Sequence, residues 1–202
     1  HDGVELLVDP GTYCYHGEPE WRQYFRSTVA HNTLELGGCD QAEAGGPFLW
    51  TTHPRTSTVG SQVGDRPVQT WAAEHDGYQR LDPPAVHRRE VALDSPGRTL
   101  TVLDTLLTTG EMPLRLMWHL GPDVSVQLDG ANAALTWSSG DERRRGQLLL
   151  PASLAWTAHR GSTAPVLGWY SPGFARRVPS TSLVGIGTGS AATRLVTTLE
   201  VP

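Results

Sequence analysis

Residues that could bind a metal ion or transfer protons are concentrated between positions 9 and 41. The segment 9–15 brings together one carboxylate, two tyrosines and a cysteine, and the segment 26–33 contains an arginine, three hydroxyl residues and His31. Residue types alone leave less specific roles open, because an aspartate in a turn commonly caps backbone N–H groups. A histidine beside a strand is likewise commonly structural. The two segments therefore present a metal or catalytic role and a purely structural role as alternatives.

Short strands separated by turns must position these side chains. The chain has 22 glycines and 15 prolines in 202 residues, too many for long helices. Residues 18–21, where proline and acids precede a tryptophan, favour the first turn of one short helix. The patterns of apolar and polar residues predict strands at 4–8, 33–36, 48–52, 69–75, 85–93, 99–107, 114–120, 124–128, 133–137, 147–150, 154–157, 166–170, 182–186 and 194–201.

Many short strands without a repeated strand–helix unit indicate an all-β fold. We expect an antiparallel two-sheet β-sandwich with at most one or two short helices, forming a single domain over residues 1–202. The chain is long enough to bury a core of its own.

Charge and hydropathy argue against two classes of function. The net charge is −5, and the one run of arginines, 143–145, follows a Gly-Asp-Glu turn and favours a solvated hairpin tip. A nucleic-acid binder needs clustered cations, and a membrane span needs a far longer apolar run than this chain contains. Cys14 and Cys39 could pair outside the cytosol or remain two unreactive thiols, and no signal-peptide pattern is present.

Two segments carry a more specific pattern. Residues 7–13 read Leu-Val-Asp-Pro-Gly-Thr-Tyr, and residues 21–33 read Trp-Arg-Gln-Tyr-Phe-Arg-Ser-Thr-Val-Ala-His-Asn-Thr, with Gln41 following. This pattern resembles the heparinase II/III-like polysaccharide lyases. The resemblance continues at 86–89, 101–105, 118–122, 168–174 and 194–202. It spans nearly the whole chain, but only the C-terminal β-sandwich domain of that family.

The resemblance implies what the rest of such a protein contains. In the lyases that this chain resembles, an N-terminal α/α toroid supplies an Asn, a His and a Tyr to the active site. A His-x-His segment with a catalytic and a metal-ligand histidine would fall before residue 1. We therefore expect a fragment of a bacterial lyase that is inactive alone, whose partners are the toroid and an acidic polysaccharide. A periplasmic or extracellular location follows from the resemblance only.

The resemblance also implies a metal site. Asp9 matches the family's metal-ligand aspartate, and His31 matches the metal-ligand histidine of its His-Asn-Thr motif. Their separation of 22 residues (31 − 9) lets a loop bring both to one point. Zinc accepts carboxylate oxygen and imidazole nitrogen in tetrahedral sites, so these two with upstream histidines would hold a structural zinc ion. Asn32 or Thr33 would orient the imidazole.

The implied reaction is β-elimination at a 4-linked uronic acid. It requires neutralising the C6 carboxylate, removing the C5 proton and protonating the departing O4, and tyrosine and histidine suit the two proton transfers. Tyr15 is the predicted catalytic residue of this chain, and an aromatic packed at the domain edge is its alternative. Arg22 and Arg26 are predicted to bind substrate carboxylates, or else to pair with Glu18 and Glu20.

A second class of function stays open, a non-catalytic carbohydrate-binding or scaffold β-sandwich module. Stacking on sugars would need several of the seven tryptophans on one open face. Trp71, Trp118, Trp137 and Trp156 lie in strand-like alternation, so we expect most of them inside. The sequence does not distinguish a heparan-like from an alginate-like or capsular polysaccharide.

Overall fold

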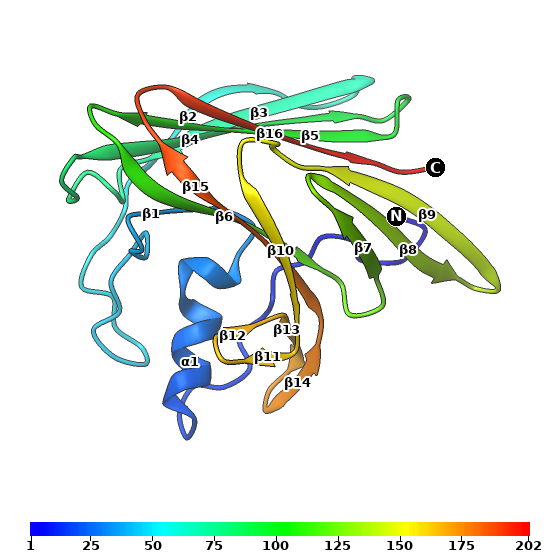
Figure 1. The fold of residues 1–202 in the computed structure, drawn as a ribbon, viewed down its shortest axis with the longest axis horizontal. Coiled ribbons are helices and arrows are strands. Elements are labelled where there is room, and N and C mark those ends of the chain that lie inside the picture. The colour runs from blue at the N-terminus through cyan, green and yellow to red at the C-terminus, as the bar shows by residue number, and fades with distance from the viewer.

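The structure, a computed structural model, describes residues 1–202 and is built almost entirely from β-strands (Figure 1). The elements in chain order are α1 (Pro19–Arg26), the 3₁₀ helix η1 (Thr28–Ala30), β1 (Leu34–Leu36), β2 (Thr56–Gln62), β3 (Val68–His75), β4 (Ala85–Asp94), β5 (Thr99–Thr108), β6 (Met112–Leu120), β7 (Ser125–Asp129), β8 (Asn132–Ser139), β9 (Glu142–Leu149), β10 (Ala155–Arg160), β11 (Ser162–Thr163), β12 (Val166–Leu167), β13 (Trp169–Gly173), β14 (Arg176–Pro179), β15 (Thr181–Gly189) and β16 (Thr193–Glu200).

Two antiparallel sheets form the layers of the sandwich. The larger sheet has eight strands in the order β2-β3-β4-β5-β16-β9-β8-β7, and the smaller has four in the order β1-β6-β15-β10. In Figure 1, β2 to β5 and β16 form the upper layer, and β6, β15 and β10 run diagonally beneath it. The hairpins β11–β12 and β13–β14 lie below, beside α1. The predicted antiparallel two-sheet β-sandwich is confirmed.

The main core lies between the two sheets and contains 21 buried residues. Strand β6 contributes to it with alternate residues such as Leu114, Leu116 and Trp118. The opposite side of β6 is covered as well, because Met117 belongs to a second cluster that packs against α1. A strand buried on both faces loses the alternation that normally marks a half-buried strand.

Helix α1 covers the outer face of the smaller sheet and buries Tyr24 and Phe25 there. It starts at a proline, whose missing N–H is not needed in the first turn of a helix. It ends where the Ser27 hydroxyl donates to the Tyr24 carbonyl at 2.7 Å. The short helix predicted near residues 18–21 is therefore confirmed, and it presents Arg22 and Arg26 on its exposed side.

Two predicted strands are wrong and one long strand was missed. Residues 4–8 make a single bridge, Leu7 with Leu120, because β1 is short and leaves only the end of β6 to be paired. Residues 48–52 contribute one bridge, Ala44 with Trp50. Strand β2 is exposed along its whole length at the sheet edge, so its polar sequence carries no core-facing pattern.

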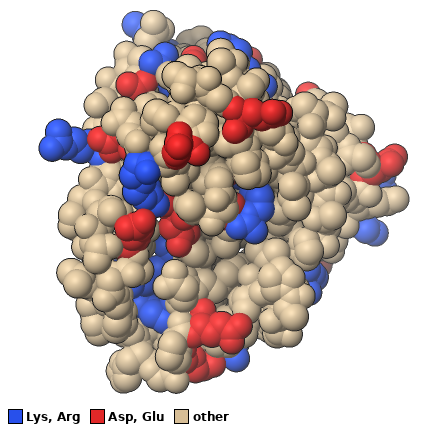
Figure 2. Space-filling view, turned by 60° about the vertical axis from the view of Figure 1, so that its left-hand side comes forward, with Lys and Arg blue, Asp and Glu red and all other residues tan.

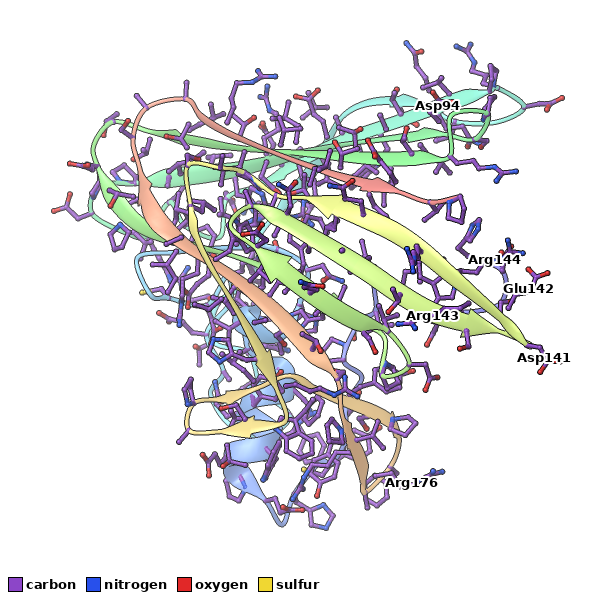
Figure 3. All side chains as sticks on the ribbon, turned by 45° about the vertical axis from the view of Figure 1, so that its right-hand side comes forward. Asp94, Asp141, Glu142, Arg143, Arg144 and Arg176 are labelled. Carbon is purple, nitrogen blue, oxygen red and sulfur yellow. The ribbon has the colours of Figure 1, made fainter.

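Charged residues of both signs are interspersed over the face seen in Figure 2. The arginine run begins just after the tip of the β8–β9 hairpin, where Asp141 and Glu142 lie beside Arg143 and Arg144 (Figure 3). Arg144 pairs with Glu142 at 2.7 Å. The prediction of a solvated hairpin tip is confirmed. No helix of this fold is both long enough and apolar enough to cross a bilayer.

Candidate functional site

The side chains of Asp9 and His31 meet at the surface of the smaller sheet. His31 Nδ1 lies 2.6 Å from Asp9 Oδ2, and the exposed fractions of the two side chains are 37% and 69%. The Gly11 N–H donates to Asp9 Oδ1 at 3.1 Å. The hydrogen bond from His31 is the main reason that the pKa of Asp9 lies below its ordinary value, and the Gly11 N–H acts in the same direction. Asp9 is therefore an ionised carboxylate at neutral pH.

The side-chain amide of Asn32 fixes the backbone on both sides of this pair. Asn32 Nδ2 donates to the Val8 carbonyl at 2.9 Å, and Asn32 Oδ1 accepts the His119 N–H at 2.6 Å. The chain before Asp9 is thereby tied to the residue after His31 and to the end of β6. The expected contribution of Asn32 is present, but it acts on the backbone beside the ligand candidates.

A second histidine–aspartate pair, which the sequence analysis missed, lies between the sheets. His87 Nε2 is 2.6 Å from Asp104 Oδ1, and Arg89 donates to both oxygens of Asp104 at 2.7 and 2.9 Å. Arg89 also donates to the Asn32 carbonyl. His75 Nε2 lies 3.2 Å from His87 Nδ1 and extends the network toward solvent. The signal in the sequence was β4 itself, which has charged residues on both faces.

This buried network has a fixed protonation pattern. Burial alone would raise the pKa of Asp104, but the charge of Arg89 and the hydrogen bond from His87 hold it below its ordinary value. Burial lowers the pKa of His75 to about 4, and His87 acts in the same direction. His75 is therefore neutral at pH 7. Its Nδ1 accepts the Gly77 N–H at 3.2 Å, so its Nε2 carries the proton that faces His87.

A small cavity of about 150 Å³ opens beside this network, lined among others by Thr33, Gln41, His75 and Arg89. Its polar groups bind one another, since the Gln41 amide donates to the Thr33 hydroxyl at 3.0 Å and Arg89 is held by Asp104. A ligand would have to break these bonds. The cavity is therefore a poor candidate for a binding site.

Tyr15 lies on the surface, with 47% of the residue exposed. Its ring stacks between those of Phe48 and Phe174, each at a centroid distance of 5.9 Å, and its hydroxyl has no hydrogen-bond partner in the chain. Tyr13, two residues earlier, is buried and its hydroxyl is held by Glu18 and Arg177. Of the two tyrosines, Tyr15 alone keeps a free hydroxyl, and its catalytic role stays a prediction.

Arg22 and Arg26 hold the loop at residues 46–49 onto α1. Arg22 donates to the Pro47 carbonyl at 3.1 and 2.8 Å, and Arg26 donates to the Leu49 carbonyl at 3.1 Å. Neither arginine pairs with the nearby acids, because Glu18 is engaged by Arg177 at 3.0 Å. A substrate carboxylate would have to compete with these carbonyls. Substrate binding by the two arginines stays a prediction.

Asp9 and His31 fit a zinc ion in type but not in number. Carboxylate oxygen and imidazole nitrogen are both zinc ligands, and the pair would exchange its shared proton for the metal. No group of three or more His, Cys, Asp or Glu side chains in the chain could hold a metal ion. A stable zinc site on Asp9 and His31 therefore needs further ligands from outside these 202 residues.

The fold and motif together define a two-sheet β-sandwich domain with an exposed His–Asp pair. The family described as "Heparinase II/III-like, C-terminal" matches residues 1–198, and the chain belongs to that family. The resemblance of the two motif segments to this family is confirmed. No curated protein matches the chain in sequence.

Several solved structures share the fold. "Heparinase III-BT4657 gene product" is 19% identical with a TM-score of 0.73, and the match covers 98% of this chain and 28% of that one. The heparan sulfate lyase HepC from Pedobacter heparinus is 15% identical with a TM-score of 0.74, covering 97% and 28%. A structure titled "Heparinase III" is 18% identical with a TM-score of 0.73, covering 100% and 28%. This chain thus spans little more than a quarter of those chains.

Proposed function

We propose that this chain is the C-terminal domain of a lyase that cleaves a uronic-acid-containing polysaccharide by β-elimination. The observation that carries the proposal is the family match over residues 1–198, in which the two residues that correspond to metal ligands lie 2.6 Å apart. Heparan sulfate is the first polymer to test, because the similar structures carry the names heparinase III and heparan sulfate lyase. Alginate is the second.

The proposed reaction divides between this chain and the rest of the protein. A base removes the C5 proton, the electron pair forms the C4–C5 double bond, the C4–O4 bond breaks, and O4 takes up a proton. From this chain, Tyr15 is the candidate for a proton transfer, because its hydroxyl is exposed and free of internal partners. The remaining acid–base groups come from the N-terminal part. The 202-residue chain alone is expected to be inactive.

The proposed role of Asp9 and His31 is to hold a structural zinc ion together with ligands from outside this chain. Such an ion would fix the loop that carries Asp9 against the segment that carries His31. The chain's own contribution is the alignment of the two donors, which the Asn32 amide maintains through Val8 and His119. The same proposal places the full-length protein in the periplasm or outside the cell, which cell fractionation tests.

The test uses the full-length protein, wild type and the Asp9→Ala/His31→Ala double variant, with His53→Ala as control because His53 is exposed. Zinc content is measured by elemental analysis after mild chelation, and turnover of heparan sulfate by the absorbance of the unsaturated product. We expect zinc in the wild type and the control and its loss in the double variant. Equal zinc in all three would reject the metal site. A wild type that forms no unsaturated product from any uronate polymer would reject the lyase.

The structure does not favour the alternative of a tryptophan-based carbohydrate-binding module. Trp118 and Trp137 are buried, and Trp71 is the single tryptophan with an exposed ring environment, at 42%. Several tryptophans on one open face are therefore not present. As expected from the strand pattern, most of the tryptophans are at least partly covered by the fold.

A further inference from the structure

An apolar ridge projects from the surface near α1, and we define it as Tyr15, Phe48, Leu49 and Phe174. These residues are 47%, 70%, 58% and 64% exposed. The three aromatic rings form one stack with Tyr15 in the middle and interplanar angles of 27° on both sides. The members come from three separate loops, so the fold gathers them deliberately into one contiguous patch. Such a patch marks an interaction surface.

The loops that present the ridge are held firmly. The Ser171 N–H donates to the Pro10 carbonyl at 2.7 Å, and the Ala175 N–H donates to the Tyr13 carbonyl at 2.8 Å. Gly11 has a φ of +83°, and a Cβ there would lie 2.6 Å from the Ser171 carbonyl oxygen. The chain after Asp9 is thus locked against the turn that carries Phe174, and the ridge is a preformed surface.

The chemistry of the ridge fits an apolar protein surface better than an acidic sugar chain. Both faces of the Tyr15 ring are covered by Phe48 and Phe174, so the middle ring offers no face for stacking on a sugar. The guanidinium of Arg22 lies 5.4 Å from the Tyr15 ring, but it already donates twice to the Pro47 carbonyl. Exposed aromatics beside an arginine are typical of protein–protein hot spots.

We propose that this ridge is the docking surface for the N-terminal part of the same full-length protein. The similar structures devote only 28% of their length to this fold, so in them most of the chain lies outside it. The ridge is continuous with the segment that starts at Asp9. The inference rests on the proposed function, because an N-terminal part that completes the site around Asp9 has to face the surface beside it.

Hydrogen exchange tests the docking without requiring turnover. Amide exchange is compared between the full-length protein and the 202-residue chain at residues 45–50 and 172–176. We expect exchange at least tenfold slower in the full-length protein. In the full-length Phe48→Ser/Phe174→Ser variant the protection is lost, and calorimetry shows separate unfolding of the two parts. The control variant Ile186→Ser/Val196→Ser, with exposures of 52% and 51%, keeps the protection.

Three results would overturn the inference. Equal exchange in the long and short chains would show that nothing covers the ridge. Protection of the short chain by added heparan sulfate oligosaccharide would make the ridge a saccharide surface. A dimer of the short chain in analytical ultracentrifugation, lost in Phe48→Ser/Phe174→Ser, would assign the ridge to a second copy. A full-length protein with a protected ridge but no lyase activity would reject the proposed function alone.

Discussion

Two histidine–aspartate pairs in this molecule have the same length and opposite surroundings. His87 and Asp104 lie 2.6 Å apart between the sheets with side-chain exposures of 3% and 0%. His31 and Asp9 also lie 2.6 Å apart, but with exposures of 37% and 69%. In the buried pair, Arg89 and His75 occupy the remaining polar atoms. In the open pair, the Nε2 of His31 has no partner in the chain.

Distance alone therefore does not separate a structural pair from a functional one. A buried carboxylate that already has every partner it can accept gives stability to the fold and has no valence left for a ligand. An exposed pair gives little stability and can accept a metal or a substrate group. Of the two pairs, only Asp9 and His31 have the free coordination that a site requires, and this contrast can be tested.

The largest expected effect is the loss of Asp104. In Asp104→Ala, Arg89 and His87 stay between the sheets without their counter-charge. Leaving a buried charge unpaired costs about 3–5 kcal/mol of the free energy of unfolding. Urea denaturation of the 202-residue chain measures it. Asp141→Ala at the exposed hairpin tip is the control (Figure 3), with a change within about 0.5 kcal/mol. A loss below about 1 kcal/mol for Asp104→Ala would mean that the network does not stabilise the fold.

The next effect is a pH dependence from His75 at the outer end of the buried network. Its pKa is about 4 in the folded chain against an ordinary value of 6.5. The unfolded chain therefore binds the proton first, and stability falls as the pH drops from about 6.5 to about 4, by up to about 3 kcal/mol. The charged and titratable groups that act on His75 are His87, Asp76 and Arg89.

Unfolding by urea at a series of pH values checks this dependence. His75→Gln removes the titrating group, so the slope of the free energy of unfolding against pH between 4 and 6.5 becomes shallower by up to one proton. The matched control is His159→Gln, since His159 contacts only the Thr157 hydroxyl. An unchanged slope in His75→Gln would assign the acid sensitivity to other groups.

A smaller effect is expected at Asn32, which links the two regions. Asn32→Ala removes the hydrogen bonds to Val8 and His119, at a cost of about 1–2 kcal/mol in urea denaturation. Asn132→Ala, at an exposed position, is the matched control. If Asn32→Ala cost no more than this control, the amide would not be what holds the Asp9 segment against β6.

The sequence predicts the sandwich because most strands have one buried face, and that face imposes a pattern. It also predicts the meeting of Asp9 and His31, through a family motif that covers both. It does not predict β2, which is exposed throughout and has no face to mark. Nor does it show that His87 and Asp104 are partners, because their contact depends on the register between β4 and β5. The side-chain contacts of Arg22 depend in the same way on a loop 25 residues away.

The smallest expected effect completes the contrast between the two pairs. Without metal, Asp9→Ala changes the free energy of unfolding of the 202-residue chain by less than about 1 kcal/mol, because water replaces the lost partner at an exposed carboxylate. In the full-length protein with zinc present, the same substitution removes the stabilisation that a bound ion gives to the folded state, so its cost rises with zinc concentration and vanishes on chelation. Urea denaturation with and without chelator measures both. A metal-independent loss as large as that of Asp104→Ala would make Asp9 and His31 a second structural pair, and the open pair would then have no claim to be a site.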